Sequence, residues 1–273
     1  DSGGAHFPCL YDVPGSLRAK TFYMGLLDGA TADGAIIGAG PRDAYATPPK
    51  TAADQSRRPV SIAQWKQEFF DTTTEPVGHG YNLVDSAHGN GFACYSFVPK
   101  AQIPLKVIVL DNTQSETDGS HDIHGHGFLD AARLKWLKEE LAAGQAADQL
   151  MIVAAHIPIG VSAIGTEMEW WESDKDPNAV EQNAASLKDL VSMLWGTPNL
   201  LMWMSGHRHF NTVKAFPSPD ASRPERGFWQ VETASLRDFP QQFRTFQIYL
   251  NSDYTVSIVT TNVDPAVAEG TPA

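Results

Sequence analysis

Cysteine and long apolar runs are both scarce in this sequence. Only Cys9 and Cys94 occur in 273 residues, and they lack the spacings of a disulfide framework or a zinc knuckle. The longest apolar runs, such as 107–110 and 200–204, have the length of a strand and fall far short of the ~20 residues that cross a bilayer. We therefore expect neither a cysteine-based scaffold nor a membrane span.

Positive charge is scarce as well. The 20 Lys and Arg residues face 32 Asp and Glu, so the formal net charge is −12. Binding to a nucleic-acid backbone needs clustered positive charge, and we expect no nucleic-acid partner. With 42% hydrophobic residues, the chain can bury a sizeable core as one large domain or two small ones. A soluble protein of the cytoplasm or the periplasm is expected, and its oligomeric state stays open.

The pattern of the chain changes near residue 100. Residues 1–60 are rich in Gly, Ala, Pro and Asp, which is typical of loops and short strands. Residues 1–100 are predicted to form a loop-rich segment with short strands, packed on the main domain. One short helix is predicted at 61–70, with Ile62, Trp65 and Phe69 on one face. Residues 101–264 are predicted to form an α/β core, and residues 265–273 a flexible tail.

Apolar runs and helical periodicity alternate in the predicted core. Strands are expected at 106–110, 150–154 and 200–204, separated by helices at about 129–143 and 184–195, and Gly144 is a plausible helix stop. Four strand-like runs without helices follow, at 212–216, 228–233, 244–250 and 255–260. The order indicates an α/β layer followed by antiparallel strands.

Histidines follow two of these predicted strands. His156 comes just after the strand at 150–154, and His207 and His209 follow the strand at 200–204. Two strands joined by a helix are expected to be parallel neighbours, so their carboxyl ends share one edge of the sheet. The three imidazoles can then converge on a metal ion. Each of them also has a simpler interpretation, as a hydrogen-bonded structural residue at a strand end.

The residues around the histidines suit phosphate chemistry. Gly206 allows the backbone to turn where the sheet ends. Arg208, between His207 and His209, is a candidate partner for a phosphate oxygen.

Two of these motifs resemble a known family. Ala155-His156-Ile157-Pro158 and Gly206-His207-Arg208-His209 are similar to the last two metal-binding motifs of the calcineurin-like metallophosphoesterase superfamily. Residues 23–268 resemble more closely a bacterial subfamily of it, through the segments 57–58, 76–80, 106–111, 235–240 and 263–265. The fold implied is α/β: the carboxyl-terminal part of a metallophosphoesterase-type β-sandwich with a mixed sheet, flanked by helices.

The resemblance implies a site with two divalent transition metals, Mn, Fe or Zn, bridged by an aspartate and a hydroxide. By the family pattern His156 and His207 bind one ion and His209 the other. The activity implied is metal-dependent hydrolysis of a phosphomonoester or phosphodiester by a metal-activated hydroxide. A small phosphoester is the expected substrate, with Arg208 as a catalytic contact to its phosphate; which ester and which metal stay open.

The sequence also departs from the family. An Asp-x-His motif, a Gly-Asp-x-x-Asp motif and a Gly-Asn-His-Asp or Gly-Asn-His-Glu motif are expected before the matching segments, and we assign none of the three to this sequence. The bridging aspartate, the asparagine ligand and the catalytic histidine of the family are therefore missing. We interpret the chain as part of a longer enzyme and leave its own activity open. The alternative is a non-catalytic metal-binding or interaction protein that kept the fold.

Several other polar residues allow two interpretations. Asp111 is favoured as a turn former over an acceptor for a ligand histidine. A glycine-rich cluster of histidines is favoured as a solvated loop over a lid or a secondary metal site; its members are His121, His124 and His126. For the remaining residues a structural role stands beside a substrate contact: His79, Asn211, and Arg237 with Asp238.

Overall fold

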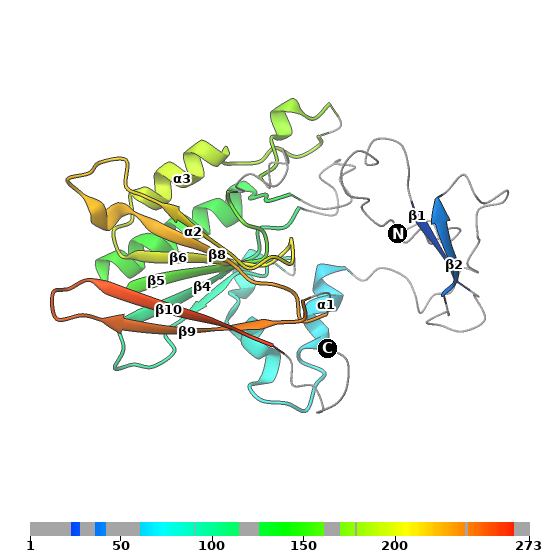
Figure 1. Ribbon diagram of the computed structural model, residues 1–273, viewed down its shortest axis with the longest axis horizontal. Coiled ribbons are helices and arrows are strands. Elements are labelled where there is room, and N and C mark those ends of the chain that lie inside the picture. The colour runs from blue at the N-terminus through cyan, green and yellow to red at the C-terminus, as the bar shows by residue number, and fades with distance from the viewer. Residues whose placement is uncertain are drawn as a thin grey trace. The chain divides into compact units, whose positions relative to one another are not determined.

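The computed structural model describes residues 23–27, 36–41, 61–89, 91–114, 126–160, 170–177, 179–237 and 240–264. The chain forms two compact units, residues 1–65 and 66–273. In the first unit, β1 (Tyr23–Leu27) pairs antiparallel with β2 (Ile36–Pro41). The second unit holds the predicted α/β core (Figure 1).

Helix α1 (Ile62–Glu68) is shorter than predicted and buries none of its residues. Trp65 remains 46% exposed, so the predicted apolar face does not form as expected. Phe69 follows in the turn after the helix, and its ring packs on Tyr81, with 5.1 Å between the ring centroids.

A six-stranded mixed sheet forms the centre of the second unit, in the order β3-β4-β5-β6-β8-β7. Its strands are β3 (Tyr95–Phe97), β4 (Leu105–Leu110), β5 (Leu150–Ala155), β6 (Leu200–Ser205), β7 (Thr212–Phe216) and β8 (Phe228–Glu232). β4, β5, β6 and β8 run parallel, and β3 and β7 are antiparallel edge strands. The predicted parallel pairing of β5 with β6 is therefore confirmed.

The strands after His209 differ from the prediction in one respect. We expected antiparallel strands only, but β8 enters the central sheet parallel to β6, between β6 and the edge strand β7. This arrangement buries Gln230, Val231 and Glu232. A strand that buries polar residues beside apolar ones has no clean alternating pattern, so the sequence did not indicate this position.

The unit has three layers, as Figure 1 shows. Helices α2 (Ala131–Ala146) and α3 (Leu187–Trp195) cover one face of the central sheet. On the other face lies an antiparallel pair, β9 (Phe243–Leu250) and β10 (Val256–Val263). The predicted fold class, α/β with a mixed sheet flanked by helices, is confirmed. Short 3-10 helices complete the elements: η4 (Val77–Leu83), η5 (Ser86–His88), η6 (Ser173–Lys175) and η7 (Pro224–Arg226).

Apolar side chains on both faces of the sheet hold these layers together. Alternate residues of β4 are buried, and Ile108 packs with Leu137 of α2 and Leu190 of α3 in the larger core. Burial of one such side chain contributes about 1.5–3 kcal/mol. A smaller core joins the central sheet to the β9–β10 pair: Ile152, Met202 and Val231 against Phe246, Ile248 and Ile258.

Helix α2 continues past Gly144, which was predicted to end it. The helix stops instead where Asp148 adopts a positive φ of 54°. The Gln149 N–H then donates to the Gly144 carbonyl at 2.9 Å, and the Asp148 N–H donates to the Gln145 carbonyl at 3.2 Å. These are the two bonds of a Schellman motif. Gly144 is buried against β5, where a Cβ would overlap Met151, so close packing explains the glycine.

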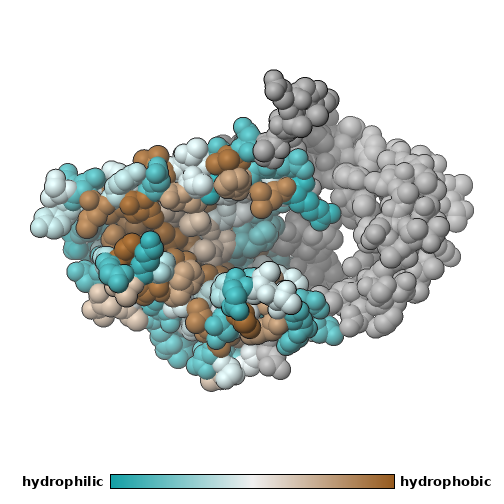
Figure 2. Space-filling model, turned by 90° about the horizontal axis from the view of Figure 1, so that it is seen from below, coloured by the Kyte–Doolittle hydropathy of each residue, from teal (hydrophilic) through white to brown (hydrophobic). Residues whose placement is uncertain are grey.

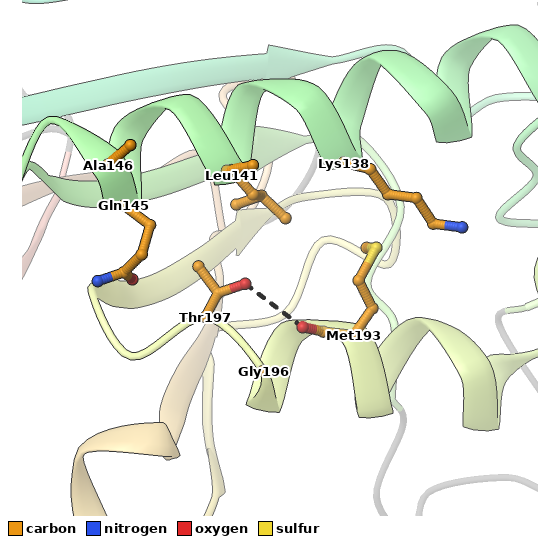
Figure 3. Close-up of a pocket in the computed structure, with 8 residues that line it drawn as sticks. Lys138, Leu141, Gln145, Ala146, Met193, Gly196 and Thr197 are labelled. Atoms are coloured by element: carbon orange, nitrogen blue, oxygen red, sulfur yellow. Dashed lines mark hydrogen bonds between the residues drawn. The ribbon is translucent and has the colours of Figure 1, made fainter.

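A groove of about 490 Å³ lies between α2 and α3. Figure 3 shows Leu141 and Met193 facing each other across it, with Thr197 donating to the Met193 carbonyl at 3.3 Å. The carboxyl ends of both helices border the groove, so it lies toward the amino ends of β5 and β6. Ligand sites in such sheets form at the carboxyl ends of the strands, away from this groove.

The surface of the second unit mixes polar and apolar side chains (Figure 2). Among the large apolar residues more than half exposed are Val213, Leu250 and Tyr254. Within the described part of the chain, every helix is too short or too polar to cross a membrane.

Candidate functional site

The carboxyl edge of the central sheet carries the candidate site. Leu110 and Ala155 are partners at the ends of β4 and β5, so Asp111 and His156 leave the sheet at the same level. The Gly206 N–H, just after β6, donates to the His156 carbonyl at 3.0 Å. This bond extends the pairing beyond the strands and brings the two histidine motifs together.

The imidazoles of His156 and His207 meet at this edge. The His156 Nε2 and His207 Nδ1 atoms lie 3.4 Å apart, and the rings are nearly perpendicular, at 82° with 5.2 Å between centroids. Two imidazoles on one tetrahedral ion, each nitrogen about 2.0–2.1 Å from the metal, have their nitrogens about 3.3–3.4 Å apart. The observed separation therefore suits a shared ion as well as a hydrogen bond between the rings.

The surroundings of His156 favour its neutral form. Although the residue remains exposed to solvent, protein atoms around the ring desolvate it and lower its pKa below 6.5. His207 and His209 lower this pKa further, and the nearby Asp111 carboxylate opposes them. A neutral imidazole has a lone pair for a metal ion, so these effects suit the predicted role.

The turn that carries His207 and His209 has an unusual backbone. Their φ angles are +77° and +62°, whereas the predicted turning residue, Gly206, does not have a positive φ. The expectation that Gly206 makes the turn is therefore wrong: the left-handed conformations fall on the histidines. A residue held in such a conformation costs of order 1–3 kcal/mol and persists only where its surroundings impose it.

Glu232 supplies part of those surroundings. Its carboxylate is completely buried at the end of β8 and binds the Arg208 guanidinium in two places, Nε to Oε1 at 3.0 Å and a terminal nitrogen to Oε2 at 2.5 Å. The Arg208 backbone N–H and the Thr212 hydroxyl also donate to it, at 3.3 Å and 3.0 Å. Arg208 was predicted to contact a phosphate; the structure places its side chain on this carboxylate, and the phosphate contact stays a prediction.

Two buried amides hold the segment after His156. Asn112, just past β4, donates to the Ile157 carbonyl at 2.7 Å and accepts from the Ile157 N–H at 3.0 Å. Gln230 of β8 accepts from the Ile159 and Gly160 N–H groups, at 2.8 Å and 3.1 Å. Sequence reasoning missed both residues, as it missed Glu232. The available signal was a polar residue within or directly after an apolar strand.

Asp111 and Asn211 have structural roles. Asp111 accepts from the backbone N–H and the hydroxyl of Thr113, at 3.0 Å and 2.6 Å, which confirms the predicted turn. The side-chain Oδ1 of Asn211 accepts from the Ala234 backbone N–H at 3.1 Å and from the Arg244 guanidinium at 3.0 Å. These bonds favour the structural interpretation of Asn211.

The remaining candidates lie elsewhere or cannot be placed. His79 Nε2 lies 2.9 Å from the Thr74 hydroxyl, and the Arg237 N–H donates to the Ser235 hydroxyl at 3.0 Å. The His126 N–H donates to Gln114 at 2.7 Å. Outside the described residues lie His121, His124 and Asp238.

The histidines do not by themselves form a complete metal site among the described residues. In the ranges that the structure describes, no three His, Cys, Asp or Glu side chains are grouped so that they could hold one ion. His156 and His207 fit as a pair, and the metal role of all three histidines stays a prediction.

Comparison with known proteins finds distant likenesses to solved structures. The sequence matches no family model and no curated protein. A solved structure to which the chain is similar is the crystal structure of a dimetal phosphatase from Danio rerio, with a TM-score of 0.43 and 15% identity over 67% of this chain. The chain spans 60% of the length of that protein. A likeness this distant carries no statement about activity.

Proposed function

We propose that this protein is a metal-dependent hydrolase of small phosphoric esters whose metal is held at the carboxyl edge of the central sheet. The observation that supports this best is the separation of His156 Nε2 from His207 Nδ1, 3.4 Å, just past the ends of two adjoining parallel strands. His209, on the same turn as His207, is proposed as a ligand of a second ion. Of the metals expected from the resemblance, Fe and Zn suit imidazole ligands, whereas Mn favours oxygen ligands.

A divalent ion bound there would supply Lewis-acid chemistry: it lowers the pKa of a water and draws charge from a phosphoryl oxygen. The chain's own contribution is to favour the neutral form of the His156 imidazole and to keep the imidazoles oriented and accessible. Burial and neighbouring histidines lower the pKa of His156, and the residue stays exposed at the strand end where a substrate can reach it. Arg208, with its charge held beside Glu232, is proposed to lie at the phosphate side of the turn.

A second candidate is a non-catalytic metal-binding or interaction protein that uses the same pair of histidines. The observation that favours it is the lack of a three-ligand group among the described residues. Two imidazoles can hold a transition metal loosely but do not form the bridged pair of ions that phosphoester hydrolysis in this family class needs.

Metal content and turnover separate the two functions. The purified chain is loaded with Mn²⁺ or Zn²⁺, dialysed, analysed for bound metal, and assayed with bis(p-nitrophenyl) phosphate. If the protein is a hydrolase, turnover depends on metal, and His207→Ala/His209→Ala abolishes it. The control is His88→Ala, which removes an exposed imidazole of η5 and should leave turnover unchanged. Bound metal without turnover would support the non-catalytic function. If the double variant binds as much metal as the wild type, both proposed functions are refuted.

A further inference from the structure

The chain crosses the end of β8 at Glu232. The segment 206–211 leaves β6 at Ser205 and returns as β7 at Thr212. Because β8 lies between those two strands, this segment must cross the carboxyl end of β8. Glu232 is the last residue of β8, and in the sheet it is the partner of both Ser205 and Thr212. Its carboxylate therefore lies under the crossing that carries His207 and His209.

The donors to this carboxylate come from segment 206–211 and from the first residue of β7. They are the backbone N–H, Nε and one terminal nitrogen of Arg208, and the hydroxyl of Thr212. A buried carboxylate is stable only when its oxygens are satisfied and its charge is paired. Arg208 meets both needs, and because it lies between His207 and His209, fixing it restricts the backbone of both histidines.

We propose that Glu232 is a positioning residue that acts through Arg208 to hold the turn of His207 and His209 so that the His207 imidazole faces His156. The consequence for metal binding rests on the proposed function. The consequence for the geometry of the turn does not, since it concerns the metal-free chain.

The proposal separates Glu232 from residues that only stabilise the fold. Another ion pair joins Lys106 of β4 to Glu140 of α2, at 2.7 Å, in the helix-covered layer. Its loss is expected to cost stability without altering the histidines. Glu140→Gln is therefore the control for Glu232→Gln, since both substitutions keep size and remove one carboxylate charge from an ion pair.

The first measurement uses the metal-free chain of residues 1–273. In the wild type, the ring protons of His156 and His207 should give an inter-ring NOE, because their centroids lie 5.2 Å apart. Glu232→Gln should lose this NOE and Glu140→Gln should keep it. Arg208→Lys, which keeps the charge but loses the two-point contact, serves where Glu232→Gln does not fold, and it too should lose the NOE. An NOE that persists in a folded Glu232→Gln or Arg208→Lys chain overturns the proposal.

The second measurement is a Co²⁺ titration followed by visible absorption. Residues that orient a metal ligand typically change affinity 10–100-fold when altered, so Glu232→Gln should weaken Co²⁺ binding at least about tenfold and change the absorption band. Glu140→Gln should do neither. If the wild type binds no Co²⁺, the proposed function fails while the NOE result still decides the role of Glu232. If Glu232→Gln binds Co²⁺ like the wild type, Glu232 has no positioning role toward a metal.

Discussion

Removal of the Asn112 side chain tests whether buried amides hold the His156 segment. Asn112 is completely buried and makes two hydrogen bonds to the backbone of Ile157. After Asn112→Ala the Ile157 carbonyl keeps the Trp203 indole N–H at 3.2 Å, so the loss there is about 1 kcal/mol. The Ile157 N–H loses its partner in a buried place, which costs about 1–3 kcal/mol. We therefore expect the free energy of unfolding to fall by about 2–4 kcal/mol.

Urea unfolding followed by tryptophan fluorescence measures this loss. All tryptophans except Trp65 lie in residues 66–273, so the signal reports chiefly on the unit that contains Asn112. The exposed Asn82 provides the control, because a surface Asn82→Ala should stay within about 0.5 kcal/mol of wild type. A change below about 1 kcal/mol for Asn112→Ala, with an unchanged denaturant slope, would refute the reasoning.

Asn112→Asp adds a test by pH. A protonated carboxyl can donate to the Ile157 carbonyl and accept from its N–H, as the amide does, whereas a carboxylate repels that carbonyl. Burial should therefore raise the pKa of the introduced carboxyl above its unfolded value of about 3.9. A raised acid pKa means that the folded state binds the proton more tightly, so the variant loses stability as the pH rises above about 4. Equal destabilisation at pH 4.5 and pH 8 would contradict this account.

Three further predictions follow from other contacts. Gly144→Ala should destabilise the chain in urea unfolding, although alanine is the better helix former by about 1 kcal/mol, because its Cβ would overlap the buried Met151; stabilisation would show that the helix is free to shift. Burial raises the pKa of the Cys94 thiol to about 12, so iodoacetamide at pH 8 should label Cys94 at least about a thousandfold more slowly in the native chain than in urea, as followed by peptide mass spectrometry. His207→Ala should raise the pKa of His156 in an NMR titration, because it removes a neighbour that lowers this pKa; an unchanged pKa in the variant would contradict the ring contact. In the wild type, the lowered pKa of His156 means that the folded state loses stability as the pH falls through 6.5.

The fold of the second unit was largely readable from local patterns. Apolar runs bounded by turn residues located β4, β5 and β6, and the helical spacing of Leu187, Leu190 and Leu194 located α3. Such patterns reflect burial on one face of an element, which neighbouring residues share. The end of α2 was misplaced because a glycine was taken as a stop, whereas its cause lies on β5, at Met151.

The candidate site was only partly readable. Strand order and the parallel βαβ rule were enough to bring His156 to His207, and the structure confirms that they meet. The residues that hold them were missed, because Asn112, Gln230 and Glu232 act on partners that are 45, 70 and 24 positions away in the sequence. Hydrogen bonds of that separation leave no periodic trace.

The sequence by itself determined which segments form strands and helices, and which residue types lie at the strand ends. That information is local, because the spacing of apolar residues and the turn residues between them decide it. Only the tertiary structure decided that β8 lies between β6 and β7, that the left-handed backbone falls on His207 and His209, and that Arg208 binds Glu232. Each of these depends on which strand is buried beside which, and a buried charge takes the one partner that the finished fold places within reach.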